Sequence, residues 1–151
     1  MSRPGTTPLF VDTGAFFAYF VENSPRHERA CAVMNAIQAG NLRFRPIHTT
    51  GYVLSELTTL ILRKKNHEKA TDTLNRIRES PVVTVVHPDE SQFESICDEF
   101  ERFDDRQISF VDHTTGTLAS EFDAEHIFAF DGDFRTLGFS LVPDDINLPE
   151  D

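Results

Sequence analysis

The stretch "IFAFDGDF", residues 127–134, is a short apolar run that ends on one acid, Asp131, turns at Gly132 and meets a second acid, Asp133. The run is typical of a buried strand. A strand that ends on two carboxylates belongs either to an ordinary surface turn or to a site that needs negative charge. A second apolar run, "PLFVDT" (8–13), ends in the same way on Asp12. The sequence therefore predicts two strands with an acid at the carboxyl end.

The rest of the chain alternates between strand-like and helix-like segments. We expect strands at 8–13, 42–49, 81–88, 126–131 and 139–143, and helices at 24–40, 50–65, 67–80, 89–103 and 109–122. Such alternation is typical of βαβ units, and it predicts an α/β protein, a three-layer α/β/α sandwich with a mainly parallel central sheet. Pro46 cannot donate a ladder hydrogen bond, so the segment that contains it is expected to be an edge strand or a short strand.

The length of 151 residues fits one domain over 1–151, and we expect the ends, 1–7 and 146–151, to be frayed. No apolar run approaches the length of a membrane span, and the first residues lack the apolar core of a secretory signal. These features predict a cytoplasmic protein that does not enter a membrane. The two widely spaced cysteines, Cys31 and Cys97, indicate buried thiols rather than a disulfide or a zinc site.

Acidic residues dominate the charge of the chain. There are 25 acids and 14 bases, which give a formal net charge of −11, and only three of the bases are lysines. This balance is what adaptation to concentrated salt produces, and an ordinary acidic protein is the alternative. Because the overall field repels nucleic acid at low salt, any nucleic-acid function depends on a local basic patch, a bound metal or screening salt.

Four acids stand at positions that need an explanation. Asp12 and Asp131 follow strands, and parallel sheets bind ligands at the carboxyl ends of their strands. Glu56 borders the apolar stripe of helix 50–65, where a carboxylate needs a cation, a partner or a path to water. Asp112 either closes the start of its helix in a capping box with Ser109 or points into the site.

A group of four carboxylates at one sheet edge repels itself unless divalent cations are present. Hard oxygen ligands suit Mg²⁺ or Mn²⁺, and four carboxylates balance two such ions in formal charge. A site of this kind can bind a phosphodiester, lower the pKa of a water molecule and stabilise the leaving oxygen.

Four segments, in this order, resemble the four motifs of PIN domains: "FVDTGAFFAYF", "YVLSELTTLILR", "SFVDHTTGTLA" and "IFAFDGDFRTLGF". The short chain is similar to the VapC-type toxins of toxin–antitoxin pairs. The resemblance implies an α/β/α fold and a Mg²⁺- or Mn²⁺-dependent endoribonuclease that a protein antitoxin inhibits.

The resemblance also implies roles for individual residues. The catalytic and metal-binding acids would be Asp12, Glu56, Asp112 and Asp131, with Asp12 and Asp112 as the most direct ligands and Asp133 as a further candidate. Thr13 and Ser109 match hydroxyl positions that support these acids. Gly14 departs from the pattern, since a larger residue or serine is common there.

The predicted reaction, hydrolysis of an RNA phosphodiester, requires bases that contact the substrate backbone. The candidates for this role are Arg63, Lys64, Lys65 and Arg135. For residues 63–65, the alternative is a solvated helix end that complements the helix dipole. The aromatic run at 16–20 is expected to be core, and an antitoxin or a homodimer contact could cover part of the phenylalanine surface.

Two rival functions remain at this point. A HAD-type phosphatase also begins with an aspartate at a strand end, but it requires a second acid two residues later, where Gly14 stands. A non-catalytic PIN-like RNA-binding or assembly module would be expected to have lost part of the acidic quartet. All four acids are present, which favours an active enzyme.

Overall fold

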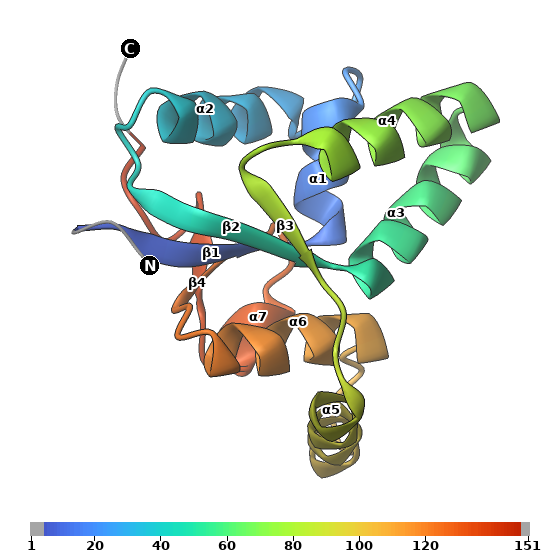
Figure 1. Ribbon diagram of the computed structural model, residues 1–151, viewed down its shortest axis with the longest axis vertical. Coiled ribbons are helices and arrows are strands. Elements are labelled where there is room, and N and C mark those ends of the chain that lie inside the picture. The colour runs from blue at the N-terminus through green and yellow to red at the C-terminus, as the bar shows by residue number, and fades with distance from the viewer. Residues whose placement is uncertain (1–4, 149–151) are drawn as a thin grey trace.

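The computed structural model describes residues 5–148 and contains one five-stranded sheet, in the order β3-β2-β1-β4-β5, in which every neighbouring pair is parallel (Figure 1). The strands are β1 (Thr7–Val11), β2 (Phe44–Thr50), β3 (Val83–Val86), β4 (His126–Phe128) and β5 (Ser140–Val142). The helices are α1 (Thr13–Phe20), α2 (His27–Gln38), α3 (Gly51–Lys64), α4 (His67–Glu79), α5 (Glu90–Arg102), α6 (Phe110–Glu121) and α7 (Asp133–Thr136). The predicted α/β fold with a parallel sheet is confirmed.

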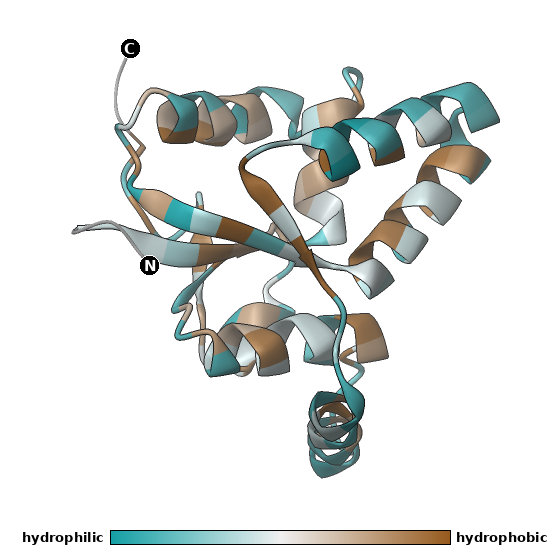
Figure 2. Ribbon diagram, in the orientation of Figure 1, coloured by the Kyte–Doolittle hydropathy of each residue, from teal (hydrophilic) through white to brown (hydrophobic). Residues whose placement is uncertain are grey.

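Helices cover both faces of the sheet. Helices α1 to α4 lie on one side, and α6 and α7 lie on the other, with α5 outside α6 (Figure 1). Each face of the sheet has its own hydrophobic core, and strand β1 contributes to both. Leu9 and Val11 pack with the first group of helices, and Phe10 packs with the second. Hydrophobic residues accordingly concentrate in the strands and on the helix faces turned toward them (Figure 2). Because β1 and β4 are parallel neighbours, their carboxyl ends lie side by side, between the two helical layers.

Helix α1 was not expected from the sequence. It begins at Thr13, immediately after the acid that follows β1, and Ala15, Phe16, Ala18 and Phe20 are all buried. A helix that is enclosed on most sides carries no polar stripe, so the amphipathic pattern that identifies a surface helix is absent. The aromatic run at 16–20 belongs mostly to the core, as expected.

Several boundaries differ from the expected ones. The helix expected over 24–40 begins later, because α2 starts at His27 and the Ser24 carbonyl accepts a turn hydrogen bond from the His27 N–H at 3.0 Å. Strand β2 is not an edge strand, because it lies between β3 and β1. Pro46 is tolerated there because it falls at the irregularity in the pairing with β1 and before the first residue paired with β3.

Helix α5 buries less of its apolar stripe than expected. Phe93, Ile96 and Phe100 form the apolar stripe of the expected helix 89–103, but Phe93 and Phe100 are 43% and 47% exposed, and Ile96 is the buried residue of this helix. The reason is position: α5 packs against α6 rather than on the sheet (Figure 1). Cys97 and Cys31 are free thiols, as expected, but they are half-buried rather than buried.

Residues 1–4 and 149–151, at the ends that were expected to be frayed, lie outside the described residues. At the described end of the chain, Ile146 and Leu148 pack against the core on the side of helices α1 to α4. Within residues 5–148, no helix combines the length and the hydropathy that crossing a bilayer requires.

Candidate metal centre

Asp12 lies at the carboxyl end of β1, where the backbone fixes its position. Its N–H donates a hydrogen bond to the Phe128 carbonyl at 3.0 Å, which ties the end of β1 to the end of β4. The side chain is 5% exposed, and within the described chain its Oδ1 has no hydrogen-bond partner. Burial raises the pKa of Asp12 to about 6, although the N–H groups of Thr13 and Gly14 pull that pKa down.

Asp112 lies in the first turn of α6, facing the same sheet edge. The Ser109 hydroxyl caps the helix by accepting a hydrogen bond from the Asp112 N–H at 3.1 Å. The Ser109 hydroxyl also hydrogen-bonds the Asp112 side chain and lowers its pKa, and a carboxylate still has lone pairs left for the site. The side chain is 9% exposed, and burial, followed by the charges of Asp12 and Asp131, raises the pKa of Asp112 to about 7.

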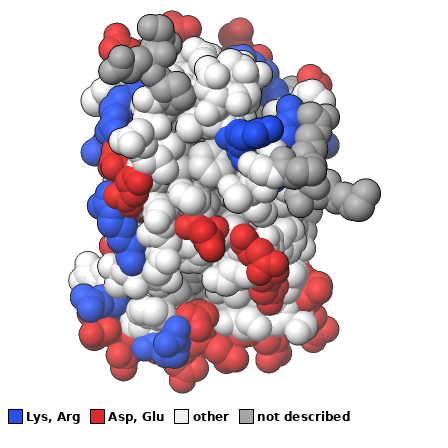
Figure 3. Space-filling view, turned by 90° about the vertical axis from the view of Figure 1, so that its left-hand side faces the viewer, with Lys and Arg blue, Asp and Glu red and all other residues white. Residues whose placement is uncertain are grey.

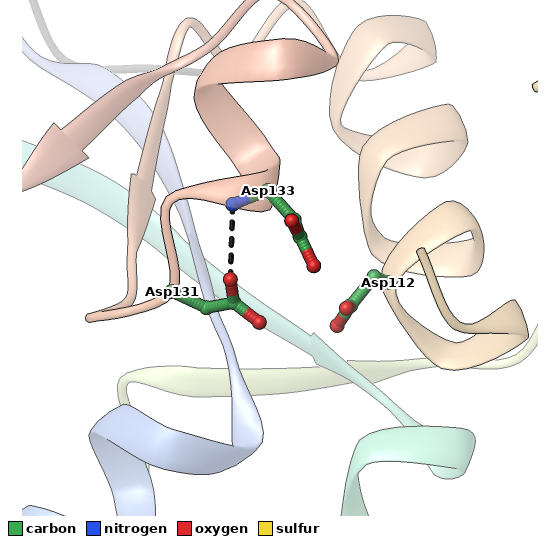
Figure 4. A group of neighbouring side chains, drawn as sticks. All are labelled: Asp112, Asp131 and Asp133. Carbon is green, nitrogen blue, oxygen red and sulfur yellow. Dashed lines mark hydrogen bonds between the residues drawn. The ribbon is translucent and has the colours of Figure 1, made fainter. Parts of the chain in front are cut away.

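Asp131 and Asp133 approach Asp112 from the segment that leads into α7 (Figure 4). The Asp131 Oδ1 accepts a hydrogen bond from the Asp133 N–H at 2.9 Å. One carboxylate oxygen from each of the three residues lies within 4.8 Å of the other two. Burial and the nearby Asp131 carboxylate raise the pKa of Asp133. Three carboxylates from two helix starts therefore converge on one point.

Glu56 approaches from the middle of α3 and stands at the water-facing edge of the group. Its side chain is exposed, and it lines a groove together with Thr13, Tyr52, Thr59, Arg63 and Val111. Its charge contributes to the raised pKa values of Asp12 and Asp112. The structure thus brings Asp112 and Asp131 together with Asp133, and it places Asp12 and Glu56 close enough for their charges to act on this group.

The arrangement fits a hard divalent cation. Within residues 5–148, none of these acids forms an ion pair with lysine or arginine. The buried Asp12 oxygen without a partner needs a proton or a cation. The raised pKa of Asp12, about 6, reflects the free-energy cost of an ionised carboxylate at this position when no cation is bound. Carboxylate oxygens are the ligands that Mg²⁺ and Mn²⁺ prefer. Among the described residues, the Thr13 Oγ1 beside Asp12 is also buried without a hydrogen-bond partner.

The candidate substrate-binding bases differ in their availability. Arg63 lines the groove beside Glu56, and the Lys64 ammonium lies 5.9 Å from the centre of the Phe17 ring. Lys65 is exposed at the end of α3. Arg135 instead donates two hydrogen bonds to the Asp145 carboxylate, from Nε at 3.0 Å and from a terminal nitrogen at 2.9 Å. Its charge is therefore already neutralised within the protein.

Comparisons with known proteins agree with this geometry. The family model of the PIN domain matches residues 9–140. The 23S rRNA-specific endonuclease VapC20 of Mycobacterium tuberculosis is 32% identical over 136 residues, which cover 89% of this chain and 97% of the relative. The crystal structure of that protein, described as a toxin that cleaves the sarcin–ricin loop, matches with a TM-score of 0.75 over 87% of this chain and 96% of the other. VapBC2 from Rickettsia felis, at 14% identity, matches with a TM-score of 0.65 over 89% of this chain and 97% of the other, and shows the fold alone.

Proposed function

This chain belongs to the PIN-domain family, and on that premise we propose that it is a Mg²⁺- or Mn²⁺-dependent endoribonuclease, the toxin of a type II toxin–antitoxin pair. The observation that supports the proposal most strongly is the convergence of Asp112, Asp131 and Asp133 beside the buried Asp12, whose oxygen lacks a partner. By similarity to the mycobacterial relative, the proposed substrate is the sarcin–ricin loop of 23S rRNA.

The proposed roles follow from the position of each acid. Asp12, Asp112 and Asp131 would hold the cation, Asp133 would contribute at the rim, and Glu56 would contribute from the groove. A divalent cation held there stabilises the charge that develops on the phosphodiester and lowers the pKa of a water molecule. Hydrolysis in line leaves a 5′-phosphate and a 3′-hydroxyl.

The neighbouring groups keep the acids in place. The N–H groups of Thr13 and Gly14 orient the Asp12 carboxylate, and the Ser109 cap fixes the turn that carries Asp112. A Cβ atom at Gly14 would lie 3.9 Å from the Asp12 Oδ2, which is ordinary contact, so the departure from the family pattern at Gly14 does not displace the acid. The enclosing helices limit access of bulk water to Asp12.

Two protein partners complete the proposal. A protein antitoxin is expected from the family, and a homodimer is expected through α5, where Phe93 and Phe100 leave apolar surface uncovered. The protein would act in the cytoplasm, where ribosomes are found. A non-catalytic PIN-like module is disfavoured because all four acids are retained and converge, and a HAD-type phosphatase is disfavoured by Gly14.

Cleavage of ribosomal RNA tests the proposal. Purified protein is incubated with ribosomes and Mn²⁺, and cuts in 23S rRNA are mapped by primer extension. We expect one dominant cut in the sarcin–ricin loop that EDTA prevents. Cuts spread along the rRNA would refute the proposed substrate, and intact rRNA in the presence of Mn²⁺ would refute the nuclease activity.

A further inference from the structure

Three cations stand over aromatic rings in or beside α1. Arg76 lies over Phe20, the last residue of α1, at the end away from Asp12, and the other two cations lie on the two sides of the helix. The Arg26 guanidinium lies 5.1 Å from the centre of the Phe130 ring, and Phe130 immediately precedes Asp131. The Lys64 ammonium lies 5.9 Å from the centre of the Phe17 ring, in the helix that follows Asp12. Helix α1 packs against both α2 and α3 and stands between them (Figure 1), so the two cations approach from opposite sides.

No carboxylate within residues 5–148 neutralises either cation. In the part of the chain that the structure describes, Arg26 and Lys64 form no ion pair, whereas Arg29 and Arg135 pair with Asp144 and Asp145. Both free cations are exposed. A guanidinium that lies over a ring still presents its N–H donors at its edge, where a phosphate can accept them.

The charge distribution makes such local cations necessary. The formal net charge is −11, and acidic side chains crowd the end of the molecule where α5 lies, while lysine and arginine form small separate groups (Figure 3). An RNA backbone therefore meets repulsion over much of the surface and needs fixed cations near the acids. Arg63, in the groove beside Glu56, extends the positive edge on the α3 side.

We propose that Arg26 and Lys64 bind the RNA phosphates on the two sides of the scissile phosphodiester, so that the strand crosses the amino-terminal end of α1. The inference rests on the proposed function, because it takes RNA as the substrate. Arg26 is a substrate-binding residue on this account: it holds the RNA strand and does not touch the reacting atoms. The role of Arg26 could not be predicted from the sequence, because Phe130 is far away along the chain.

The salt dependence of RNA binding tests this inference. A labelled stem-loop RNA is titrated with the full-length protein in EDTA, which stops hydrolysis, and affinity is measured by fluorescence anisotropy over a range of salt concentrations. Each lost phosphate contact lowers the slope of log affinity against log salt by about 0.7–0.9. We expect Arg26→Gln and Lys64→Gln each to show that change in slope, with affinity about threefold to tenfold weaker at low salt.

Matched variants separate phosphate binding from general charge and from packing. Arg29→Gln removes the same charge three residues further on, in the first turn of α2, but the Arg29 guanidinium pairs with Asp144 at 2.7 Å, so the slope should stay at the wild-type value. Arg26→Lys keeps the cation and should also keep the slope. Equal slopes for Arg26→Gln and Arg29→Gln would overturn the inference and leave packing on Phe130, or a protein ligand, as the role of Arg26. A wild-type protein that does not bind the RNA would overturn it too.

A parallel cleavage assay keeps this inference apart from the proposed function. If the wild-type protein cuts RNA with Mn²⁺ but the slopes do not change, the phosphate contacts are wrong and the nuclease assignment stands. If the wild-type protein binds RNA with the expected slopes but does not cut it, the nuclease assignment fails and the phosphate contacts stand.

Discussion

Replacing Asp112 with asparagine should stabilise the metal-free protein at alkaline pH while it abolishes nuclease activity. Asparagine has nearly the same shape but cannot ionise, so the substitution removes the buried negative charge and leaves the packing intact. Asp112 is 9% exposed and faces the charges of Asp12 and Asp131. We therefore expect the acidic cluster to lower the stability of the metal-free protein, because its repelling charges are needed for function.

The magnitude follows from the pKa of Asp112. It rises from 3.8 to about 7 in the folded protein, and each unit corresponds to about 1.4 kcal/mol. The ionised side chain therefore costs up to about 4 kcal/mol, and we expect a gain of about 2–4 kcal/mol in the variant because the buried amide keeps part of the desolvation cost. A raised carboxyl pKa destabilises the fold only where the group ionises, so the gain is full above about pH 7 and disappears near pH 4.

Urea unfolding in EDTA at constant ionic strength measures the free energy of unfolding of the wild type and of Asp112→Asn, near pH 4 and above pH 7. Asp105→Asn is the control, because it removes the same charge from a side chain that is 75% exposed and should change stability by less than about 0.5 kcal/mol. Added Mn²⁺ should stabilise the wild-type protein and leave Asp112→Asn nearly unchanged. Equal stability of the wild type and Asp112→Asn at alkaline pH, or a difference that persists at acid pH, would refute the reasoning.

Three further predictions concern neighbouring features. Asp133→Asn should lower the cleavage rate about tenfold. Asp131→Asn should lower it by a larger factor, because Asp131 acts electrostatically on both Asp12 and Asp112. Initial cleavage rates with Mn²⁺ measure the two effects, and a larger loss for Asp133→Asn would contradict the assignment. Arg135→Gln should destabilise the protein only slightly, because its ion pair with Asp145 is exposed, and it should not change RNA affinity in EDTA. Weaker RNA binding would show that Arg135 contacts the substrate. The double substitution of Phe93 and Phe100 by serine should convert a dimer into a monomer in analytical ultracentrifugation, and a wild type that is monomeric, or a variant that stays dimeric, would exclude the α5 interface.

The parts of the fold that the sequence predicted depend on local patterns. Apolar runs that end on Asp12 and Asp131 indicate strand ends, and parallel strands bring their carboxyl ends to one edge, so the two acids had to lie close together. The Asn66 side chain, directly before the expected helix 67–80, caps α4 by accepting a hydrogen bond from the Lys69 N–H at 2.8 Å, which is a role that asparagine often takes. The Ser109 motif likewise marked the start of α6.

The remaining features depend on contacts that no local pattern encodes. The apolar stripe of α5 predicted that one face would be covered, but the position of α5 outside α6 leaves Phe93 and Phe100 exposed. Arg135 looked like a free substrate contact until the fold brought Asp145 beside it. The contact of Arg26 with Phe130 joins segments more than 100 residues apart, so its place near the acids emerges only from the tertiary structure.

The central claim is that the acidic cluster binds a divalent cation and cuts RNA, and a Mn²⁺ titration of RNA cleavage tests it most directly. Initial rates on a stem-loop RNA are compared for the wild type, Asp12→Asn and the exposed control Asp105→Asn. We predict a saturable rise in rate with Mn²⁺ for the wild type and for Asp105→Asn, no activity in EDTA, and loss of at least about 100-fold in activity for Asp12→Asn. Cleavage that persists in EDTA, or equal rates for Asp12→Asn and the wild type, would contradict the claim.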